Sequence, residues 1–263
     1  MAKILAVTNQ KGGVGKTTTT VNLAASLAAL KQQVLLVDLD PQGNATMGSG
    51  IDKTSLQSSI YQVLLGEKGL HEVREYSKTG KYDVLPSNRE LAGAEIELIE
   101  MDGRETRLKQ ALQTVAEAYD YILIDCPPAL NLLTLNGLCA AQSVMIPMQC
   151  EYYALEGLSD LVNTIRKVRA HLNHELEIEG LLRTMFDPRN TLAQHVSAQL
   201  EQHFGNKVYR TVIPRNVRLA EAPSYGMPVL YHDKQSKGTQ AYLALAGELL
   251  SNAGQTTAAK EEN

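Results

Sequence analysis

The sequence predicts a doubly wound α/β fold, in which helices cover both faces of a mostly parallel β-sheet. Short apolar runs alternate with longer segments of helical periodicity along the chain. Several of these runs are continuous in Val, Ile and Leu, as expected for parallel strands that are covered on both sides. A loop rich in glycine and lysine joins the first run to the first helical segment. In such folds ligands bind at the carboxyl ends of the strands.

Seven segments have the length and composition of strands. They are Lys3–Thr8, Gln33–Leu39, Tyr82–Leu85, Tyr121–Asp125, Ser143–Met148, Ile178–Met185 and Lys207–Thr211. Apolar residues at helical spacing predict one helix after the glycine-rich loop and a longer one further on, each with a core-facing stripe. The stripes are Leu23, Leu27 and Leu30, and Leu155, Leu158, Leu161, Val162, Ile165, Val168 and Leu172. Because no repeat or linker divides the chain, we expect one domain over residues 1–250 and a polar, disordered tail over 251–263.

The composition is that of a globular protein, since 44% of the 263 residues are hydrophobic and 21% are charged. Cys126, Cys139 and Cys150 have no C-x-x-C spacing. We therefore expect buried thiols in a reducing cytoplasm, with neither a disulfide framework nor a zinc site. No signal peptide is expected, and no apolar run approaches the roughly 20 residues that cross a bilayer.

The run Asn9–Thr18 has the sequence NQKGGVGKTT. A strand, a glycine-rich loop and a helix N-terminus in this order present backbone N–H groups to anionic oxygens, as in a phosphate-binding loop. In this interpretation Lys16 contacts the terminal phosphates and the Thr17 hydroxyl is a ligand of Mg²⁺. The alternative is a glycine turn before a helix. Three glycines, two lysines and paired threonines in this context favour nucleotide binding.

Gln10 and Lys11 depart from the usual pattern G-x-x-x-x-G-K-[ST] of such loops. The usual pattern has glycine where this chain has Gln10, and it does not require a lysine at position 11. A second lysine at the loop entrance is placed to reach phosphates outside its own loop. We therefore expect Lys11 to contact phosphates that a facing subunit binds.

The second expected strand leads into Asp38-Leu39-Asp40, which the turn-forming residues 41–44 follow. Alternation places Asp38 and Asp40 on the same face, beside the phosphate-binding loop. One carboxylate would orient an attacking water, and the other would support the metal shell. The alternative is a capped turn. A turn alone does not explain two acids at a phosphate site, so we favour a functional role.

Tyr121–Asp125 is an apolar strand that ends in an acid. This is the Walker B form, in which the carboxylate holds Mg²⁺ directly or through water. Alone the signal is weak, because many strands end in Asp, but the preceding phosphate-binding loop strengthens it. The following Pro127-Pro128 either ends the strand or stiffens a loop beside the γ-phosphate, which is a suitable place for a switch.

Five segments together resemble the ParA/Soj chromosome-partitioning ATPases, which belong with MinD and nitrogenase iron protein to the deviant Walker A group. They are KGGVGKTT, LLVDLDPQGN, YILIDCPP, QCEYYALEGL and VIPRNVRLAEAPS. The resemblance covers about residue 2 to about residue 250. It implies a Mg²⁺-dependent ATPase of the short form, without a preceding helix-turn-helix domain. The ATP state would be a sandwich dimer on non-specific double-stranded DNA, and a ParB-type partner would stimulate its slow hydrolysis. The protein would be cytoplasmic and nucleoid-associated, for chromosome or plasmid segregation.

The resemblance also implies roles for single residues. Lys11 is the signature lysine that reaches the facing subunit's phosphates, Asp40 is the acid needed for hydrolysis, and Asp125 is the Walker B acid. The other nucleotide contacts are Gly12, Gly13, Val14 and Gly15 (backbone amides), Lys16 (β- and γ-phosphates), Thr17 (Mg²⁺), Thr18 (α-phosphate), Pro214, Arg215 and Asn216 (near adenine), and Glu151 (across the dimer).

DNA binding requires a local basic surface, because the whole chain has a net charge of −4. The stretch from Arg183 to Arg218 has six basic and two acidic side chains, a net of +4, which leaves −8 for the rest. Within it, Arg189 on a turn and Arg218 near a helix start are the expected phosphate contacts. The alternative for each arginine is an ordinary solvated surface position. No aromatic platform for single strands accompanies them, so duplex backbone binding is favoured.

Three other classes share parts of this pattern. A membrane-cycling ATPase of the MinD type needs an amphipathic C-terminal helix, which the sequence does not indicate, so no membrane partner is expected. A nitrogenase-type reductase needs two cluster-binding cysteines per subunit on facing loops, and the three cysteines do not have this arrangement. A non-enzymatic, nucleotide-gated adaptor is distinguished only by showing hydrolysis that depends on Asp40.

Overall fold

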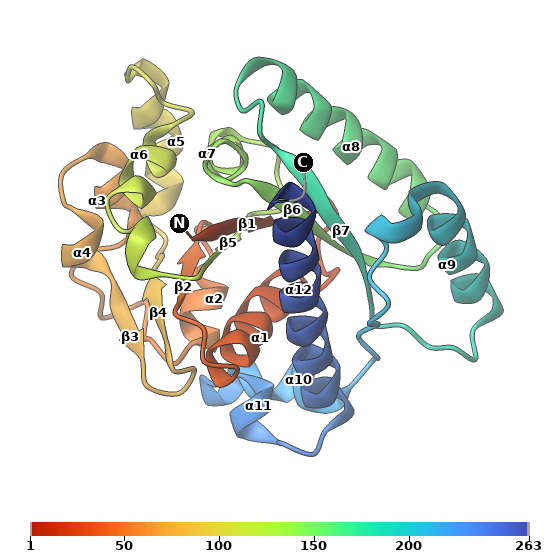
Figure 1. The fold of residues 1–263 in the computed structure, drawn as a ribbon. Helices are drawn as coiled ribbons and strands as arrows, with labels where there is room; N and C mark the ends of the chain where they lie inside the picture. Colours follow the sequence, from red (N-terminus) through yellow and green to blue (C-terminus); the bar gives the residue numbers. More distant parts are fainter. Residues whose placement is uncertain (1, 262–263) are drawn as a thin grey trace.

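The structure, a computed structural model, describes residues 2–261, with side chains described up to Ala253. In this part of the chain one sheet has seven strands in the order β3-β4-β2-β5-β1-β6-β7 (Figure 1). All neighbouring pairs are parallel except the edge pair β3 and β4. The strands are β1 (Lys3–Val7), β2 (Val34–Asp38), β3 (Glu75–Ser77), β4 (Tyr82–Leu85), β5 (Tyr121–Asp125), β6 (Ser143–Gln149) and β7 (Glu177–Thr184).

Helices cover both faces of this sheet, as the sequence predicts. Along β2, Leu35 and Val37 pack into one hydrophobic core and Val34 and Leu36 into the other, so the strand is buried on both sides. The first core is closed by α7 (Leu132–Ala140) and α8 (Ala154–His171) among others, and the second by α1 (Lys16–Ala29) and α12 (Lys237–Glu261). Figure 1 shows α1 and α12 side by side in front of the sheet. The doubly wound architecture is confirmed.

The remaining helical segments are short, except α9. They are α2 (Asn44–Gly48), α3 (Ile60–Leu65), α4 (Leu70–Val73), α5 (Leu91–Glu97), α6 (Arg107–Gln113), α9 (Thr191–Phe204), α10 (Val217–Glu221), α11 (Val229–His232), and the 3₁₀ turns η1 (Leu98–Glu100), η2 (Ala116–Ala118), η3 (Gly205–Lys207) and η4 (Ala222–Tyr225). Among the helices of residues 2–261, none is both long and apolar enough to cross a membrane.

The prediction of a seventh strand over Lys207–Thr211 is wrong. This segment begins in η3 and touches the sheet at the single bridge between Leu181 and Val208. The reason lies in its backbone N–H groups, because those of Arg210 and Thr211 donate to the Glu248 carboxylate of α12 at 2.7 and 2.9 Å. They are therefore not available for a strand ladder. The sequence analysis also missed β3, a short strand at the exposed edge.

The expected tail also differs from the structure. Helix α12 continues through Ser251 to Glu261, where the sequence predicts disorder from residue 251. Alanines have the highest helix propensity, and extension of a formed helix is far easier than nucleation, so a packed helix can continue into a polar segment. Residues 262–263 of the expected tail lie outside the described residues.

The sheet register places the functional candidates together at the carboxyl ends of the central strands. Val7, the last residue of β1, lies beside Asp125 of β5, and Asp125 lies beside Asp38 of β2. The glycine-rich loop leaves β1 at this edge, between β5 and β6. The carboxyl ends of these strands therefore bring together three segments that are far apart in the sequence.

Candidate active site

The glycine-rich loop has the backbone of a phosphate-binding cradle. Gly13 and Gly15 adopt positive φ values of 74° and 87°, which side chains rarely permit. A Cβ on Gly12 or Gly13 would meet nothing within 4 Å, so the loop is open on this side. The carbonyl of Val14 accepts a hydrogen bond from Thr184 Oγ1 at 2.8 Å, which ties the loop to the end of β7. Thr18 lies in the first turn of α1, where N–H groups face the loop.

Lys16 is buried at the centre of this loop. Its Nζ donates to the carbonyl oxygen of Lys11 at 3.1 Å. Burial lowers the pKa of Lys16, and the neighbouring carboxylates of Asp125 and Asp40 oppose that shift. A buried ammonium held by one carbonyl retains donors for an anion, and phosphate oxygens are the anions that such a loop accommodates.

Lys11 points to a different partner. Its Nζ forms an ion pair with Glu151 at 2.5 Å, and the side chains of both residues are 50% exposed. The backbone N–H of Lys11 is fixed by Asn9 Oδ1 at 3.0 Å, and Asn9 is held in turn by the carbonyl of Pro147 in β6. The ammonium group of Lys11 therefore lies at the surface, and Glu151 is its partner within the chain.

Asp125 is fully buried and accepts two hydroxyl hydrogen bonds from α1. Thr17 Oγ1 donates to Oδ2 at 2.7 Å and Thr20 Oγ1 donates to Oδ1 at 3.1 Å. Burial, followed by the charge of Asp38, raises the pKa of Asp125 to about 8. The Thr17 hydroxyl and the Asp125 carboxylate are hard oxygen donors on facing elements, so this pair fits Mg²⁺. The sequence analysis did not identify Thr20.

Asp38 differs from the expectation of a second free carboxylate beside the phosphates. It is fully buried and accepts hydrogen bonds from the backbone N–H and hydroxyl of Thr46 at 2.8 and 2.7 Å and from the Asp40 N–H at 3.2 Å. Burial raises the pKa of Asp38 to about 6. Its oxygens accept hydrogen bonds from the chain itself, so Asp38 organises the turn, as in the alternative of a capped turn. Support of a metal shell by one of the two acids remains a prediction.

Asp40 is partly buried and keeps a freer carboxylate. One of its oxygens accepts the N–H of Gln42 at 2.9 Å in a local turn. Its backbone carbonyl accepts a hydrogen bond from Ser87 Oγ at 2.8 Å, and the Ser87 N–H donates to Thr46 Oγ1 at 2.9 Å. Asp38, Thr46, Ser87 and Asp40 thus form one connected network. Sequence reasoning missed Thr46 and Ser87, although Ser87 follows an expected strand and could have been examined for that reason.

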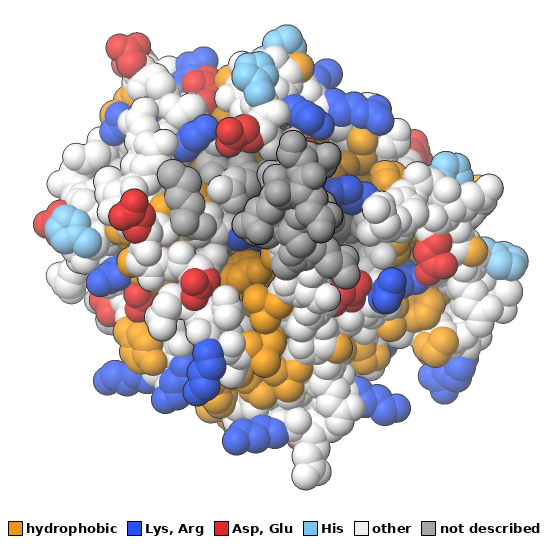
Figure 2. Space-filling view, viewed as in Figure 1, with side chains coloured by type: hydrophobic (Ala, Val, Ile, Leu, Met, Phe, Trp, Pro, Cys, Tyr) orange, Lys and Arg blue, Asp and Glu red, His pale blue; other side chains and the backbone are white. Residues whose placement is uncertain are grey.

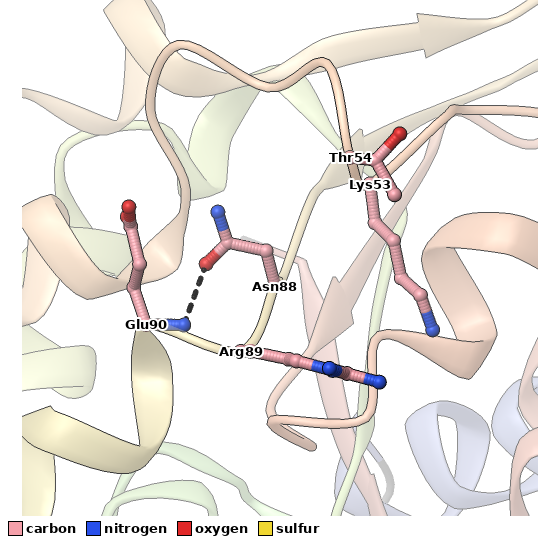
Figure 3. Close-up of a pocket in the computed structure, with 5 residues that line it drawn as sticks. All are labelled: Lys53, Thr54, Asn88, Arg89 and Glu90. Atoms are coloured by element: carbon pink, nitrogen blue, oxygen red, sulfur yellow. Dashed lines mark hydrogen bonds between the residues drawn. The ribbon is translucent and has the colours of Figure 1, made fainter.

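A hydrogen bond and a close approach of the backbone constrain the turn after Asp40. Lys53 Nζ donates to the carbonyl of Gln42 at 2.5 Å. Gly43 has φ of 59°, and a Cβ there would lie 2.7 Å from the carbonyl oxygen of Ser87. A cavity of about 350 Å³ is lined by Lys53, Thr54, Asn88, Arg89 and Glu90. In Figure 3 the side chains of Lys53 and Arg89 extend in the same direction.

The segment expected near adenine lies close to the glycine-rich loop. Pro214 pairs with Phe186 in an isolated bridge after β7, and Asn216 caps α10 through its side-chain oxygen. Arg215 and Glu151 line the same cavity of about 190 Å³. Gln149, which also lines it, donates to the carbonyl of Gly13 at 3.3 Å. The structure therefore brings the two regions together, and their contacts with nucleotide remain predictions.

The arginines expected to bind DNA are both at the surface. The Arg189 side chain is 89% exposed and pairs with Asp187 at 2.9 Å, which lowers the pKa of Asp187 to about 2. Arg218 pairs with Glu221 at 2.8 Å and with Asp233 at 3.3 Å. In the view of Figure 2, Lys and Arg side chains lie along the lower rim of the molecule, where Figure 1 places α10 and α11. Contact of these two arginines with DNA remains a prediction.

Arg183 corrects the charge argument from the sequence. It is buried and donates to Ser197 Oγ at 2.7 Å, to the Glu201 carboxylate and to the carbonyl of Tyr209. These contacts join β7 to α9 and to the segment after η3. One of the six basic charges in this stretch is therefore structural and cannot contact a phosphate.

The three cysteine thiols are free and buried, as expected. Burial raises the pKa of Cys139 and of Cys150 to about 11 and raises that of Cys126 as well. The thiols are therefore protonated at neutral pH and pack as small apolar groups.

Comparison with known proteins agrees with this geometry. The family described as "AAA domain" matches residues 2–178. The sporulation initiation inhibitor protein Soj of Bacillus subtilis (strain 168) is 54% identical over 252 residues, which cover 96% of this chain and 100% of Soj. The chromosome partitioning protein ParA of Myxococcus xanthus is 50% identical over 250 residues, covering 95% of this chain and 88% of that protein.

A solved structure with bound ligands has the same fold. Cobyrinic acid a,c-diamide synthase from Mycobacterium smegmatis, with bound ATP analog and magnesium, superposes with a TM-score of 0.84 at 38% identity and covers 95% of each chain. The sequence matches to Soj and ParA extend over nearly the whole of this chain. This chain belongs to the ParA/Soj family of chromosome-partitioning ATPases.

Proposed function

We propose that this protein is a Mg²⁺-dependent ATPase whose ATP state is a homodimer that binds double-stranded DNA without sequence preference. A ParB-type partner stimulates its slow hydrolysis, and the cycle segregates a chromosome or plasmid on the nucleoid in the cytoplasm. The observation that carries the proposal is the convergence of Lys16, Thr17 and Asp125 at one edge of the sheet, next to Asp40.

The glycine-rich loop and Lys16 bind the phosphates of ATP. The open backbone of Gly12 to Gly15 supplies N–H donors, and the buried ammonium of Lys16 offsets negative charge on the terminal phosphates. Thr17 and Asp125 hold Mg²⁺, and Thr18 contacts the α-phosphate. When bound, the metal neutralises charge on the phosphate oxygens. Burial raises the pKa of Asp125 above that of an ordinary carboxyl, because the charged form is poorly solvated. A bound cation therefore stabilises the ionised form of Asp125.

Asp40 orients the attacking water. Its carboxylate lies near Lys16 and is positioned by the network through Ser87 and Thr46. A positioned acid or base contributes roughly 10²- to 10⁴-fold to a rate. Asp40 is therefore assigned to chemistry, and Asp38 to the turn that holds it.

Lys11 and its neighbours support the proposed dimer. Lys11 lies at the surface next to Glu151, and the exposed rings of Tyr152 and Tyr153 stack edge to face with centroids 5.0 Å apart. Exposed aromatic side chains beside a charged pair are typical of a protein interface. A second subunit that faces this surface receives Lys11 at its phosphates and Glu151 near its nucleotide.

Dimerisation also explains how ATP can control DNA binding. One basic surface neutralises few DNA phosphates. In a rigid dimer, binding of the first surface holds the second surface near the DNA at a high effective concentration, which strengthens the second contact. Arg189 and Arg218 each have a carboxylate neighbour, so a DNA phosphate competes with that neighbour for the guanidinium donors. The resulting affinity depends steeply on salt and little on sequence.

The test is a DNA titration at several salt concentrations with ATP, with ADP and without nucleotide. The slowly hydrolysing Asp40→Ala chain with ATP should bind unrelated duplexes with similar affinity, which falls steeply with salt. Equal affinity in all three nucleotide states would contradict control by ATP. Absence of DNA binding at low salt, together with absence of ATP turnover, would favour the non-enzymatic adaptor.

A further inference from the structure

Helix α5 and the 3₁₀ turn η1 carry two isoleucines that the fold does not bury. The inner side of this continuous helical segment is formed by Leu91, Ala94 and Leu98, which are fully buried. Ile96 is 75% exposed and Ile99 is 57% exposed. Their spacing of three residues places both on one outer face. Apolar side chains gathered on a surface mark an interaction site more often than isolated ones do.

The same segment and the turn after it are strongly acidic. Residues 90–105 contain six acidic side chains and one basic side chain, Arg104. Arg104 is occupied, because it donates to the carbonyl of Ile99 at 2.6 Å and to Glu105 at 3.0 Å. Glu97, Glu100 and Asp102 are exposed. We call Ile96, Ile99, Glu97, Glu100 and Asp102 the α5 surface.

The α5 surface is connected to the loop that follows the Walker B strand. Glu95 accepts a hydrogen bond from Asn131 Nδ2, and Asn131 Oδ1 caps α7 by accepting the N–H of Thr134 at 3.0 Å. Asn131 ends the loop that starts after Asp125 and contains Pro127 and Pro128. On the other side, Glu97 accepts the hydroxyl of Tyr61 at 2.7 Å. A ligand on this surface therefore contacts a helix that is hydrogen-bonded to the hydrolysis site's own loop.

We propose that the α5 surface is the docking site for a basic segment of the protein partner that stimulates hydrolysis. The segment presents apolar side chains to Ile96 and Ile99 and lysines or arginines to Glu97, Glu100 and Asp102. Charge complementarity selects this occupant: a nucleic acid is repelled by the acids, and a second acidic copy gains nothing from them. Docking shifts the Asn131 loop through Glu95. The inference rests on the proposed ATPase cycle and deepens it.

The first experiment measures ATP turnover of the full chain while the full-length ParB-type protein of the same organism is titrated. We expect the combined change Ile96→Ser and Ile99→Ser to raise the half-maximal partner concentration on the order of tenfold, since a few central residues dominate such interfaces. Glu100→Lys with Asp102→Lys should act in the same direction. Basal turnover and the ATP-dependent dimer mass should not change.

Matched controls carry the same substitutions elsewhere. Leu172→Ser alters an exposed leucine directly after α8, and Glu175→Lys alters an exposed acid that precedes β7. Both should respond to the partner as the unaltered chain does. Undiminished stimulation of the Ile96 and Ile99 variant would overturn the proposal. Loss of its ATP-dependent dimer would assign the surface to a second copy, which also overturns it.

The connection to the loop has its own test. Asn131→Asp keeps the oxygen that caps α7 but removes the donor to Glu95 and places two carboxylates together. Partner affinity, measured with the Asp40→Ala background, should be retained, whereas maximal stimulation should fall several-fold. Adding Glu95→Gln restores a donor to the new carboxylate and should recover stimulation. Absence of that recovery would contradict the coupling. If the partner does not stimulate even the unaltered chain, the proposed function fails, and this result is distinct from failure of the surface alone.

Discussion

The ammonium group of Lys11 lies 2.5 Å from a carboxylate oxygen of Glu151, and each side chain is half exposed. Exposed ion pairs of this kind contribute little to stability, about 0–1 kcal/mol. A multiply charged phosphate from a facing subunit can therefore replace Glu151 as the partner of Lys11 at small cost. Lys16, in contrast, is buried within its own loop, where we propose that it binds the phosphates of its own subunit's nucleotide.

The two lysines should consequently separate nucleotide binding from dimerisation. Lys16→Ala should lose ATP binding, because no other buried cation remains in the loop. Lys11→Ala should retain much of the ATP affinity and lose the ATP-dependent dimer. Titration with a fluorescent ATP analogue measures the first property, and light scattering with ATP, with ADP and without nucleotide measures the second. One mass in all three conditions for the unaltered chain would exclude the sandwich dimer.

Replacement of Asp40 should remove chemistry and leave assembly. Asp40→Ala retains Lys11, Lys16 and Thr17, so it should bind ATP and dimerise, while turnover falls by ~10²–10⁴-fold. Single-turnover phosphate release measures the rate, and the dimer mass is the control. Turnover at the unaltered rate would show that Asp40 has only a structural role.

The contact of Ser87 with the Asp40 carbonyl predicts a smaller effect of the same kind. Ser87→Ala should lower turnover about tenfold, because a catalytic group that is displaced by a fraction of an ångström loses effectiveness. ATP affinity should not change, and the free energy of unfolding should fall by about 1 kcal/mol for the lost hydrogen bond.

A double-variant comparison distinguishes this positioning role from a general structural one. In the Asp40→Ala background, Ser87→Ala should have no further effect on turnover, because the group it positions is gone. Ser87→Thr, which keeps the hydroxyl, should recover much of the rate. Additive losses in the double variant would mean that Ser87 acts independently of Asp40.

The arginines at the surface should affect DNA binding alone. Arg189→Glu and Arg218→Glu should weaken binding to every duplex and reduce the salt dependence, while ATP-dependent dimerisation is retained. Arg166→Glu, an exposed arginine on α8, is the matched control. A filter-binding or anisotropy titration at several salt concentrations gives both the affinity and the slope. An equal effect of all three substitutions would indicate a general charge effect with no defined surface.

Much of the fold could be predicted from the sequence because the buried strands are continuous aliphatic runs. Six of the seven expected strands are present, and the two helix stripes lie in α1 and α8 except for their last residues, Leu30 and Leu172, which follow the helices and are exposed. The exceptions have local causes: Glu248 captures the backbone around Arg210, and β3 is too short and exposed to have a hydrophobic pattern. The expectation that Asp40 and Asp125 lie near the phosphate-binding loop is also met, because the charges of both carboxylates act on Lys16. Their roles in hydrolysis and metal binding remain predictions.

The supporting contacts could not be predicted in the same way. Ser87 lies 47 residues from Asp40 in the chain, and Thr20 lies 105 residues from Asp125, so only the folded sheet brings them together. The contrasting burial of Asp38 and Asp40 also depends on where Thr46 returns to the end of β2. A charge count could not separate the buried Arg183 from the exposed Arg189, because both are arginines in one stretch.

Gly43 has a consequence for genetics. Its left-handed backbone passes so close to the Ser87 carbonyl that any side chain would force the turn after Asp40 to move. A random screen for chains that still form the ATP-dependent dimer but no longer turn over ATP should therefore recover substitutions at Gly43. Such alleles would keep the protein in its assembled form and could be dominant over the normal copy, since each mixed dimer would contain one subunit that does not reset.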